Sequence, residues 1–129
     1  MPSPREVFEK LLNGIVDQDF ASLSTLYAED TVVTQMFIVP GPNRIEGRAG
    51  LEKHFGTVPP VKMAARNVVI HETGDPEVVV AEWTYDVEVI PTGKKFSTDN
   101  VIVARVRDGL IVESRDYHNH AVFADAFRA

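Results

Sequence analysis

The stretch that decides the fold is residues 78–118, VVVAEWTYDVEVIPTGKKFSTDNVIVARVRDGLIVESRDYH. It contains three segments rich in β-branched and aromatic residues, separated by Pro91-Thr92-Gly93 and Arg107-Asp108-Gly109. Glycine next to proline, threonine or aspartate is typical of tight turns, so the stretch predicts three consecutive antiparallel strands. The first strand, over residues 78–90, alternates between apolar and polar residues, as a strand with one buried face does.

The register of these strands depends on the length of the two turns. Three-residue loops, with each glycine in the left-handed position after a type I turn, place Val106 opposite Leu110, apolar against apolar. The alternative at the second turn is a two-residue loop of Asp108 and Gly109, which places Arg107 opposite Leu110 and shifts the pairing by one residue. We prefer three-residue loops at both turns. Six polar residues are then expected on one face: Thr84, Asp86, Thr98, Asn100, Asp116 and His118, with Thr98 opposite Asp86 and Asn100 opposite Asp116.

Length and composition favour one ordinary globular domain, residues 1–129. The chain is 44% hydrophobic and 25% charged, with a formal net charge of −6. This acidic balance argues against binding to nucleic acid or to an anionic membrane surface, which requires clustered basic residues. The chain has no cysteine, no signal-peptide core and no apolar run as long as a membrane span, so we expect a cytoplasmic protein.

Helices are predicted before and after the strands. Ser3-Pro4-Arg5-Glu6 forms a capping box with proline at the first helical position, so a helix begins there. Asp19 is expected to cap a second helix that reaches Tyr27, and Asn119 a last short helix. The other predicted elements are a strand over 31–39, a loop over 40–44, a helix over 47–56 and a strand over 66–73. This order predicts an α+β domain with a mixed or antiparallel sheet.

Several short motifs accompany this order: Tyr27-Ala28-Glu29-Asp30-Thr31, Gly47-Arg48, Pro91-Thr92-Gly93-Lys94 and Arg115-Asp116-Tyr117. Together they resemble the nuclear transport factor 2-like superfamily, which includes the ketosteroid isomerases and the SnoaL-like polyketide cyclases. The chain most resembles the limonene-1,2-epoxide hydrolase branch. The resemblance implies a strongly bent mixed sheet wrapped round a pocket, with helices closing it, in the order ααβαββββα.

The resemblance also implies a homodimer. Its interface would be the convex face of the sheet, formed by Trp83, Tyr85, Val87 and Val89. The alternation alone predicts something different, with Trp83 and Tyr85 in the core of one subunit and Asp86 in water. We prefer the arrangement in which Asp86 faces the pocket, because it agrees with the face matching described above.

In the epoxide hydrolases, two aspartates bridged by an arginine activate a water molecule held by a tyrosine and an asparagine. The resemblance places the two aspartates at Asp86 and Asp116. The arginine position is Thr84, and the tyrosine and asparagine positions are Val33 and Gln35. Isomerase, cyclase or dehydratase chemistry is therefore as well supported as epoxide hydrolysis.

Asp86, Asp116 and His118 are the candidate catalytic residues. Two carboxylates facing one partly dry cavity cannot both ionise cheaply, so one pKa should rise, giving a general acid and a general base. His118, two residues along from Asp116, could titrate with Asp116 as its orienting partner. The alternatives are that Asp86 is a solvated strand residue and that Asp116 belongs to a structural ion pair.

The candidate binding residues are of two kinds. Polar side chains would orient a water molecule or a substrate oxygen: Gln35, Thr84, Thr98 and Asn100. Apolar side chains, which by default belong to the core, would form the wall of the pocket: Leu12, Ile15, Met36, Phe55, Val58 and Phe123.

These residues predict a cofactor-independent enzyme acting on a small apolar, oxygen-bearing molecule, such as a polyketide, a terpenoid or a steroid-like compound. We expect no metal, because no two histidines have metal-ligand spacing on one helix. Two other functions remain open. The domain could bind a small ligand without turnover, or it could be an interaction domain that assembles through the convex face of its sheet.

Overall fold

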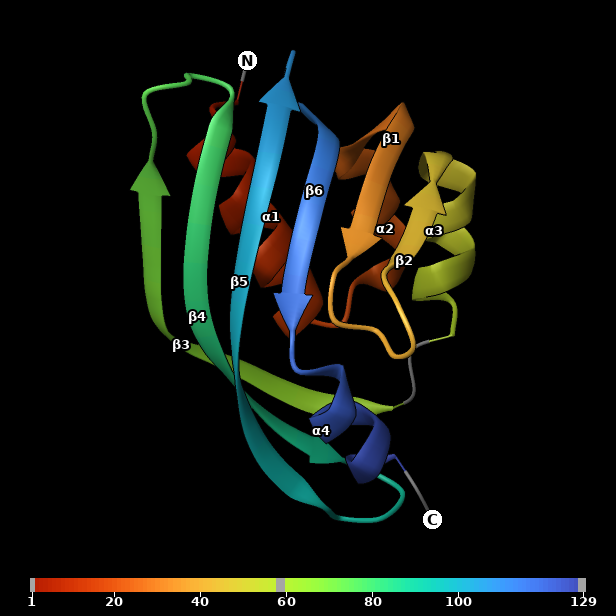
Figure 1. Ribbon diagram of the computed structural model, residues 1–129. Coiled ribbons are helices and arrows are strands. Elements are labelled where there is room, and N and C mark those ends of the chain that lie inside the picture. The colour runs from red at the N-terminus through yellow and green to blue at the C-terminus, as the bar shows by residue number, and fades with distance from the viewer. Residues whose placement is uncertain (1, 58–59, 128–129) are drawn as a thin grey trace.

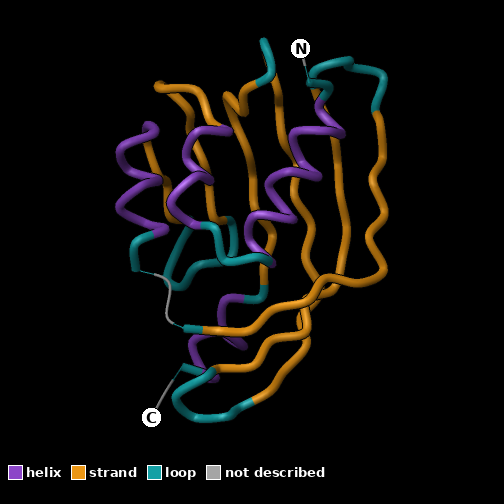
Figure 2. The backbone as a smooth tube through the Cα atoms, turned by 180° about the vertical axis from the view of Figure 1, so that it is seen from behind, coloured by secondary structure: helices purple, strands orange, loops and turns teal. Residues whose placement is uncertain are grey.

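The computed structural model describes residues 2–57 and 60–127. One six-stranded sheet, in the order β2-β1-β6-β5-β4-β3, bends strongly around helices that lie on one side of it (Figures 1 and 2). Only β1 and β6 pair in parallel, so the sheet is mixed, and the predicted α+β fold is confirmed. The elements are α1 (Pro4–Val16), α2 (Phe20–Leu23), a 3₁₀ turn (Ser24–Leu26), β1 (Tyr27–Gln35), β2 (Asn43–Glu46), α3 (Gly47–Phe55), β3 (Val61–Glu72), β4 (Val78–Val89), β5 (Lys95–Arg107), β6 (Leu110–His118) and α4 (His120–Ala126).

The element order differs from the prediction at one point, the additional strand β2. This strand forms where a loop was expected over residues 40–44, and Asn43 pairs with Gln35 at the end of β1. The second helix is also shorter than predicted, because α2 and the 3₁₀ turn end before Tyr27 and that residue begins β1. Strand β3 begins at Val61 because its first residues pair with the far end of β4. In each case long-range pairing outweighs the local turn and helix signals.

Three helix caps were predicted, and two of them are confirmed. The Ser3 hydroxyl accepts a hydrogen bond from the Glu6 backbone N–H at 3.2 Å, and the Glu6 carboxylate accepts one from the Ser3 N–H at 3.1 Å. The Asn119 side chain accepts a hydrogen bond from the Val122 N–H at 3.2 Å. The predicted cap at Asp19 is wrong, because its carboxylate accepts a hydrogen bond from the Ser22 hydroxyl rather than from a helix N–H.

Ser3→Ala should lower the free energy of unfolding by about 1 kcal/mol, because it leaves the Glu6 N–H without its capping acceptor. Urea denaturation of the two proteins measures the difference. Ser3→Asp is the matched control, since aspartate also caps helices well and should keep most of the stability. An equal loss in both variants would show that the cap contributes nothing.

The turn between β5 and β6 is the two-residue alternative, so our preference for three residues was wrong. Asp108 and Gly109 both have positive φ, 55° and 78°, and Arg107 lies opposite Leu110. A bulge beyond the turn adds one residue to β6, after which Asn100 lies opposite His118. The pairing is therefore two residues from the predicted one. Asn100, Asp116 and His118 still share a face, because a shift of two keeps every side chain on its side.

The turn between β4 and β5 has the larger consequence. Val89 and Lys94 close a loop of residues 90–93, in which the Val89 N–H donates to the Lys94 carbonyl at 2.8 Å and Gly93 has a φ of 70°. This loop is one residue longer than predicted, so Trp83 pairs with Asn100. The extra residue moves Thr84 and Asp86 to the face opposite Asp116.

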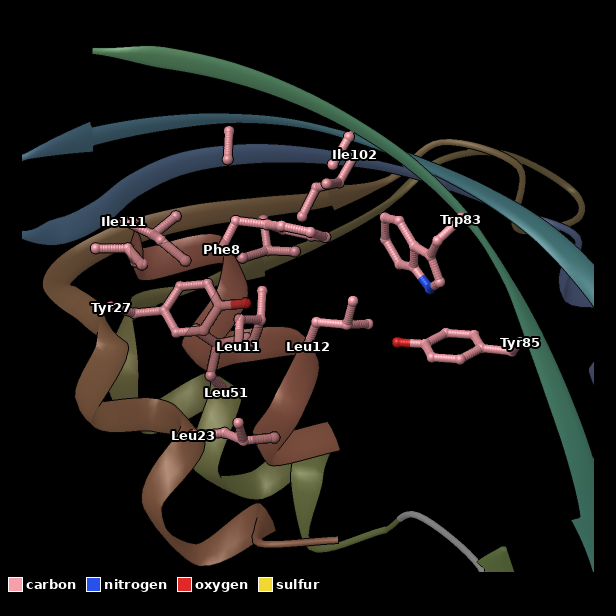
Figure 3. Close-up of a cluster of buried hydrophobic side chains, with 14 of the residues drawn as sticks. Phe8, Leu11, Leu12, Leu23, Tyr27, Leu51, Trp83, Tyr85, Ile102 and Ile111 are labelled. Carbon is pink, nitrogen blue, oxygen red and sulfur yellow. The ribbon is translucent and has the colours of Figure 1, made fainter. Parts of the chain in front are cut away.

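The inner face of β4 packs on α1 within the same subunit. Trp83 contacts Phe8, with ring centroids 5.2 Å apart, and meets Tyr85 edge-on at 5.5 Å (Figure 3). The predicted dimer interface through Trp83, Tyr85, Val87 and Val89 is therefore wrong, because all four side chains are at most 5% exposed in the single chain. Among the described residues, no helix is both long and apolar enough to cross a bilayer.

Candidate active site

A cavity of about 440 Å³ lies between the inner face of the sheet and the helices. Its apolar wall comes from the helices α1 to α4 and the strands β1 to β5, together with Phe127 just after α4. Its polar groups are Tyr27, Gln35, His54, Thr57, Trp83, Tyr85, Asp116, His118 and His120. An apolar cavity with a few converging polar groups is the usual form of a small-molecule site.

Seven of the predicted site residues line this cavity: Leu12, Ile15, Gln35, Phe55, Asp116, His118 and Phe123. Thr98 and Asn100 lie on the inner face of β5 and are buried, but they do not line the cavity. Met36 follows β1 and also lies outside the lining. Thr84 and Asp86 are on the other side of the sheet, and Val58 lies outside the described residues.

Asp116 is the carboxylate of the cavity. It lies on β6, and its Oδ1 accepts a hydrogen bond from the Ser114 hydroxyl at 3.1 Å. Burial raises the pKa of Asp116 to about 6, an effect that the Ser114 hydrogen bond partly opposes. No lysine or arginine is among the described residues that line the cavity. At neutral pH the side chain is therefore an ionised but poorly solvated base.

His118 lies beside Asp116, with its Nε2 atom 4.0 Å from Asp116 Oδ2. Burial and, to a smaller extent, the neighbouring His120 lower the pKa of His118 to about 4. The imidazole is thus neutral at neutral pH, and this contact is not an ion pair. The His118 ring also meets Trp83 edge-on, with centroids 6.0 Å apart. His118 therefore connects the carboxylate to the aromatic part of the cavity.

Two tyrosines and Trp83 supply neutral hydrogen-bond donors. Burial raises the pKa of Tyr27 and of Tyr85. At Tyr85 the Trp83 side chain partly opposes this rise, and the negative charge of Asp116 adds to it at both residues, so both phenols stay protonated. Figure 3 shows the two hydroxyl groups pointing toward one another, with the indole nitrogen of Trp83 at the Tyr85 end. Sequence reasoning missed these three residues because it placed Trp83 and Tyr85 on the convex face and Tyr27 in a helix.

Asp86 is a surface residue, so the predicted carboxylate pair is wrong. Its carboxylate accepts hydrogen bonds from the Ser97 hydroxyl at 2.6 Å and from Arg66 Nε at 2.9 Å. The Ser97 hydrogen bond and then Arg66 lower the pKa of Asp86, the opposite direction from Asp116. Thr84 is also engaged on this face, where its hydroxyl donates to Asp99 at 2.7 Å. The structure therefore agrees with the alternative interpretation, in which Asp86 is a solvated strand residue.

The described residues that line this cavity offer few ligands for a charged cofactor or a metal ion. The described lining residues include no cationic lysine or arginine that would neutralise the phosphate groups of a nucleotide. Across residues 2–57 and 60–127, no three His, Asp or Glu side chains are grouped so that they could hold a metal ion.

Comparison with known proteins agrees with this fold. The family model of the SnoaL-like domain matches residues 8–114. The uncharacterised protein YesE of Bacillus subtilis (strain 168) is 30% identical over 125 residues, which cover 95% of this chain and 85% of that protein. A crystal structure from Bacillus subtilis, provisionally described as an isomerase, superposes with a TM-score of 0.84 at 29% identity, covering 95% of this chain and 90% of that one.

A structure from Pseudomonas putida KT2440, provisionally described as a polyketide cyclase, covers 98% of both chains. Its TM-score is 0.80 at 13% identity, a likeness of fold alone. The match to the family model, by contrast, extends over most of the chain, from the first helix to the strand that carries Asp116. The chain therefore belongs to the SnoaL-like family.

Proposed function

We propose that the chain is a cofactor-independent enzyme that moves a proton on a small, largely apolar, oxygen-bearing molecule. The observation that carries this proposal is the Asp116 carboxylate, which lines an apolar cavity with only 16% of its side chain exposed and has its pKa raised to about 6. A general base works best when its pKa is near the operating pH, and burial is the usual means of raising a carboxylate to that range.

The chemistry proposed for Asp116 is removal of a proton from a carbon next to a carbonyl group. The carboxylate takes the proton and becomes a carboxylic acid, and the electron pair of the C–H bond moves to the carbonyl oxygen as an enolate. The neutral donors Tyr27, Trp83 and Tyr85 would stabilise that oxygen. Where the substrate also carries a carbon–carbon double bond conjugated with the enolate, Asp116 can return the proton to the far carbon of that bond, which moves the double bond and is an isomerisation. Alternatively, the enolate carbon can attack a second carbonyl carbon of the same molecule, whose oxygen takes up the proton, and this closes a ring.

The comparisons support this class of reaction, because structures of the same fold are provisionally described as an isomerase and a polyketide cyclase. The substrate class that we propose is therefore a polyketide, a terpenoid or a steroid-like ketone. The apolar wall and the volume of the cavity suit such a molecule.

The test is the exchange of the α-protons of α-tetralone, a bicyclic aromatic ketone, for deuterium in D₂O. We expect the protein to accelerate this exchange, and the rate should rise with pH through about 6 and then level off. The direction follows because only the ionised form of Asp116 accepts a proton, and that form predominates above its pKa. Proton NMR measures the loss of the α-proton signal. A rate equal to the buffer blank, or one that does not change near pH 6, would contradict the proposal.

The second candidate is a binding module with the same cavity and no turnover. It is favoured by the position of Asp86, since only one of the two aspartates implied by the epoxide hydrolases reaches the cavity. This function would give binding of α-tetralone without accelerated exchange, so the same experiment separates the two candidates.

A further inference from the structure

The buried indole N–H of Trp83 has no hydrogen-bond partner within the described residues. Three residues that line the cavity carry an unpartnered buried polar atom, namely Trp83, His118 and His120. A neutral imidazole nitrogen can be a donor or an acceptor according to its tautomer, whereas an indole nitrogen can only donate. The Trp83 side chain lowers the pKa of Tyr85, yet its N–H and the Tyr85 hydroxyl do not form a hydrogen bond of normal geometry. The unmet requirement at Trp83 is therefore specifically for an acceptor atom.

The Trp83 ring is held firmly in place, so its N–H has a defined direction. Its side chain is packed between Phe8, with ring centroids 5.2 Å apart, and the edge contacts to Tyr85 and His118 at 5.5 and 6.0 Å. The residue is 5% exposed. In Figure 3 the indole nitrogen lies at the edge of the Trp83 ring that is on the side of Tyr85. Leaving such a donor unpaired in an apolar interior is unfavourable, which is a reason to expect a bound acceptor.

The sheet register places this donor next to the base. Trp83, Asn100 and His118 lie side by side across β4, β5 and β6, while Asp116 is the next inward residue of β6 after His118. His118 contacts both the Trp83 ring and the Asp116 carboxylate. An oxygen bound at Trp83 and a carbon close to Asp116 therefore belong to adjoining parts of one small molecule.

We propose that the cavity binds a neutral, ring-bearing carbonyl compound whose carbonyl oxygen accepts a hydrogen bond from Trp83 Nε1. This inference rests on the proposed function for the choice of a carbonyl group. The ligand is neutral because Asp116 is negative at neutral pH and the described lining offers no lysine or arginine to a carboxylate. It carries rings because aromatic side chains on α1, α3 and α4 face the cavity: Phe8, Phe55 and Phe123.

The first test uses the unmodified protein labelled with ¹⁵N. The sequence contains one tryptophan, so the indole N–H of Trp83 gives a single NMR resonance. We expect α-tetralone to move this resonance downfield, and tetralin, the matching hydrocarbon without oxygen, to leave it near its free position. Equal shifts with both compounds, or no shift with either, would overturn the inference.

The second test is Trp83→Phe, which keeps an aromatic ring and removes the N–H. The affinity for α-tetralone should fall by about tenfold, the value of one hydrogen bond, while the affinity for tetralin should stay the same. Phe123→Leu is the control, because it alters the apolar wall alone and should weaken both compounds equally. Equal weakening of both compounds in Trp83→Phe would overturn the inference.

Neither measurement requires turnover, so the two proposals can fail separately. A downfield shift without accelerated exchange would leave the carbonyl site standing and refute the enzyme. Accelerated exchange without that shift would support the enzyme and refute the carbonyl site at Trp83.

Discussion

Asp116→Asn is expected to lower the rate of α-proton exchange on α-tetralone by about 100- to 10,000-fold, the usual contribution of a general base. Asparagine has nearly the same shape and can still accept the hydrogen bond from the Ser114 hydroxyl. Its amide cannot take up a proton at neutral pH, so the loss reports proton transfer rather than packing. Proton NMR in D₂O measures the rate, and the ¹⁵N shift of Trp83 shows whether the ligand still binds.

Asp86→Asn is a close control for this experiment. It makes the same chemical change on the other face of the sheet, where the carboxylate binds Ser97 and Arg66 at the surface. We expect it to leave the exchange rate unchanged. If Asp86→Asn lowered the rate as much as Asp116→Asn, or if Asp116→Asn kept the wild-type rate, Asp116 would not be the base.

The contrast between these two aspartates also shows what the sequence could determine. The strands over residues 78–118, the bent mixed sheet and the presence of Asp116 and His118 on one inner face were all predicted and are confirmed. The prediction of which residues of β5 and β6 face inward is correct, although the prediction of the turn between them is wrong. The two-residue turn and the bulge together shift the pairing by two residues, which keeps each side chain on its face.

The prediction of which residues of β4 face inward is wrong, because the loop between β4 and β5 shifts the pairing by an odd number of residues. Loops of three and four residues are both compatible with the sequence Pro91-Thr92-Gly93, and the difference of one residue exchanges the two faces of a strand. The turn sequence does not determine the loop length to within one residue, because a glycine with positive φ at position 93 is compatible with a loop of three or of four residues. The alternation of apolar and polar residues in β4, taken on its own, predicts that Trp83 and Tyr85 are buried, and this prediction is correct.

Tyr27 illustrates a different limit. It was placed in a helix with Leu23 and Leu26 on the basis of helical spacing, yet it begins β1 and pairs with Ile111, which is far away in the sequence. Arg48 stabilises this position, because its guanidinium donates two hydrogen bonds to the Tyr27 carbonyl, at 2.7 and 3.0 Å. Neither contact leaves a local signal, so a side chain that lines the cavity together with Asp116 could only be found in the structure.

Asp116→Asn should also make the protein more stable, raising the free energy of unfolding at neutral pH by about 2–3 kcal/mol. Folding raises the pKa of Asp116 from 3.8 to about 6, and a shift of this size corresponds to about 3 kcal/mol. The folded state therefore holds the proton more tightly than the unfolded state does. Below pH 3.8 both states are protonated and there is no penalty. Stability falls as the pH rises from there to about 6, and it stays at the lower level above that.

Urea denaturation of the wild type and the variant at several pH values measures this difference. The gap between them should open with rising pH between about 4 and 6, since asparagine does not titrate. Asp86→Asn should show the opposite sign, because the pKa of Asp86 is lowered by its partners and its ionised form favours the folded state. A destabilised Asp116→Asn variant would mean that the carboxylate is held by favourable contacts and is not a strained base. A stabilised but inactive variant would show that the fold tolerates a costly buried charge at the position where proton transfer requires one.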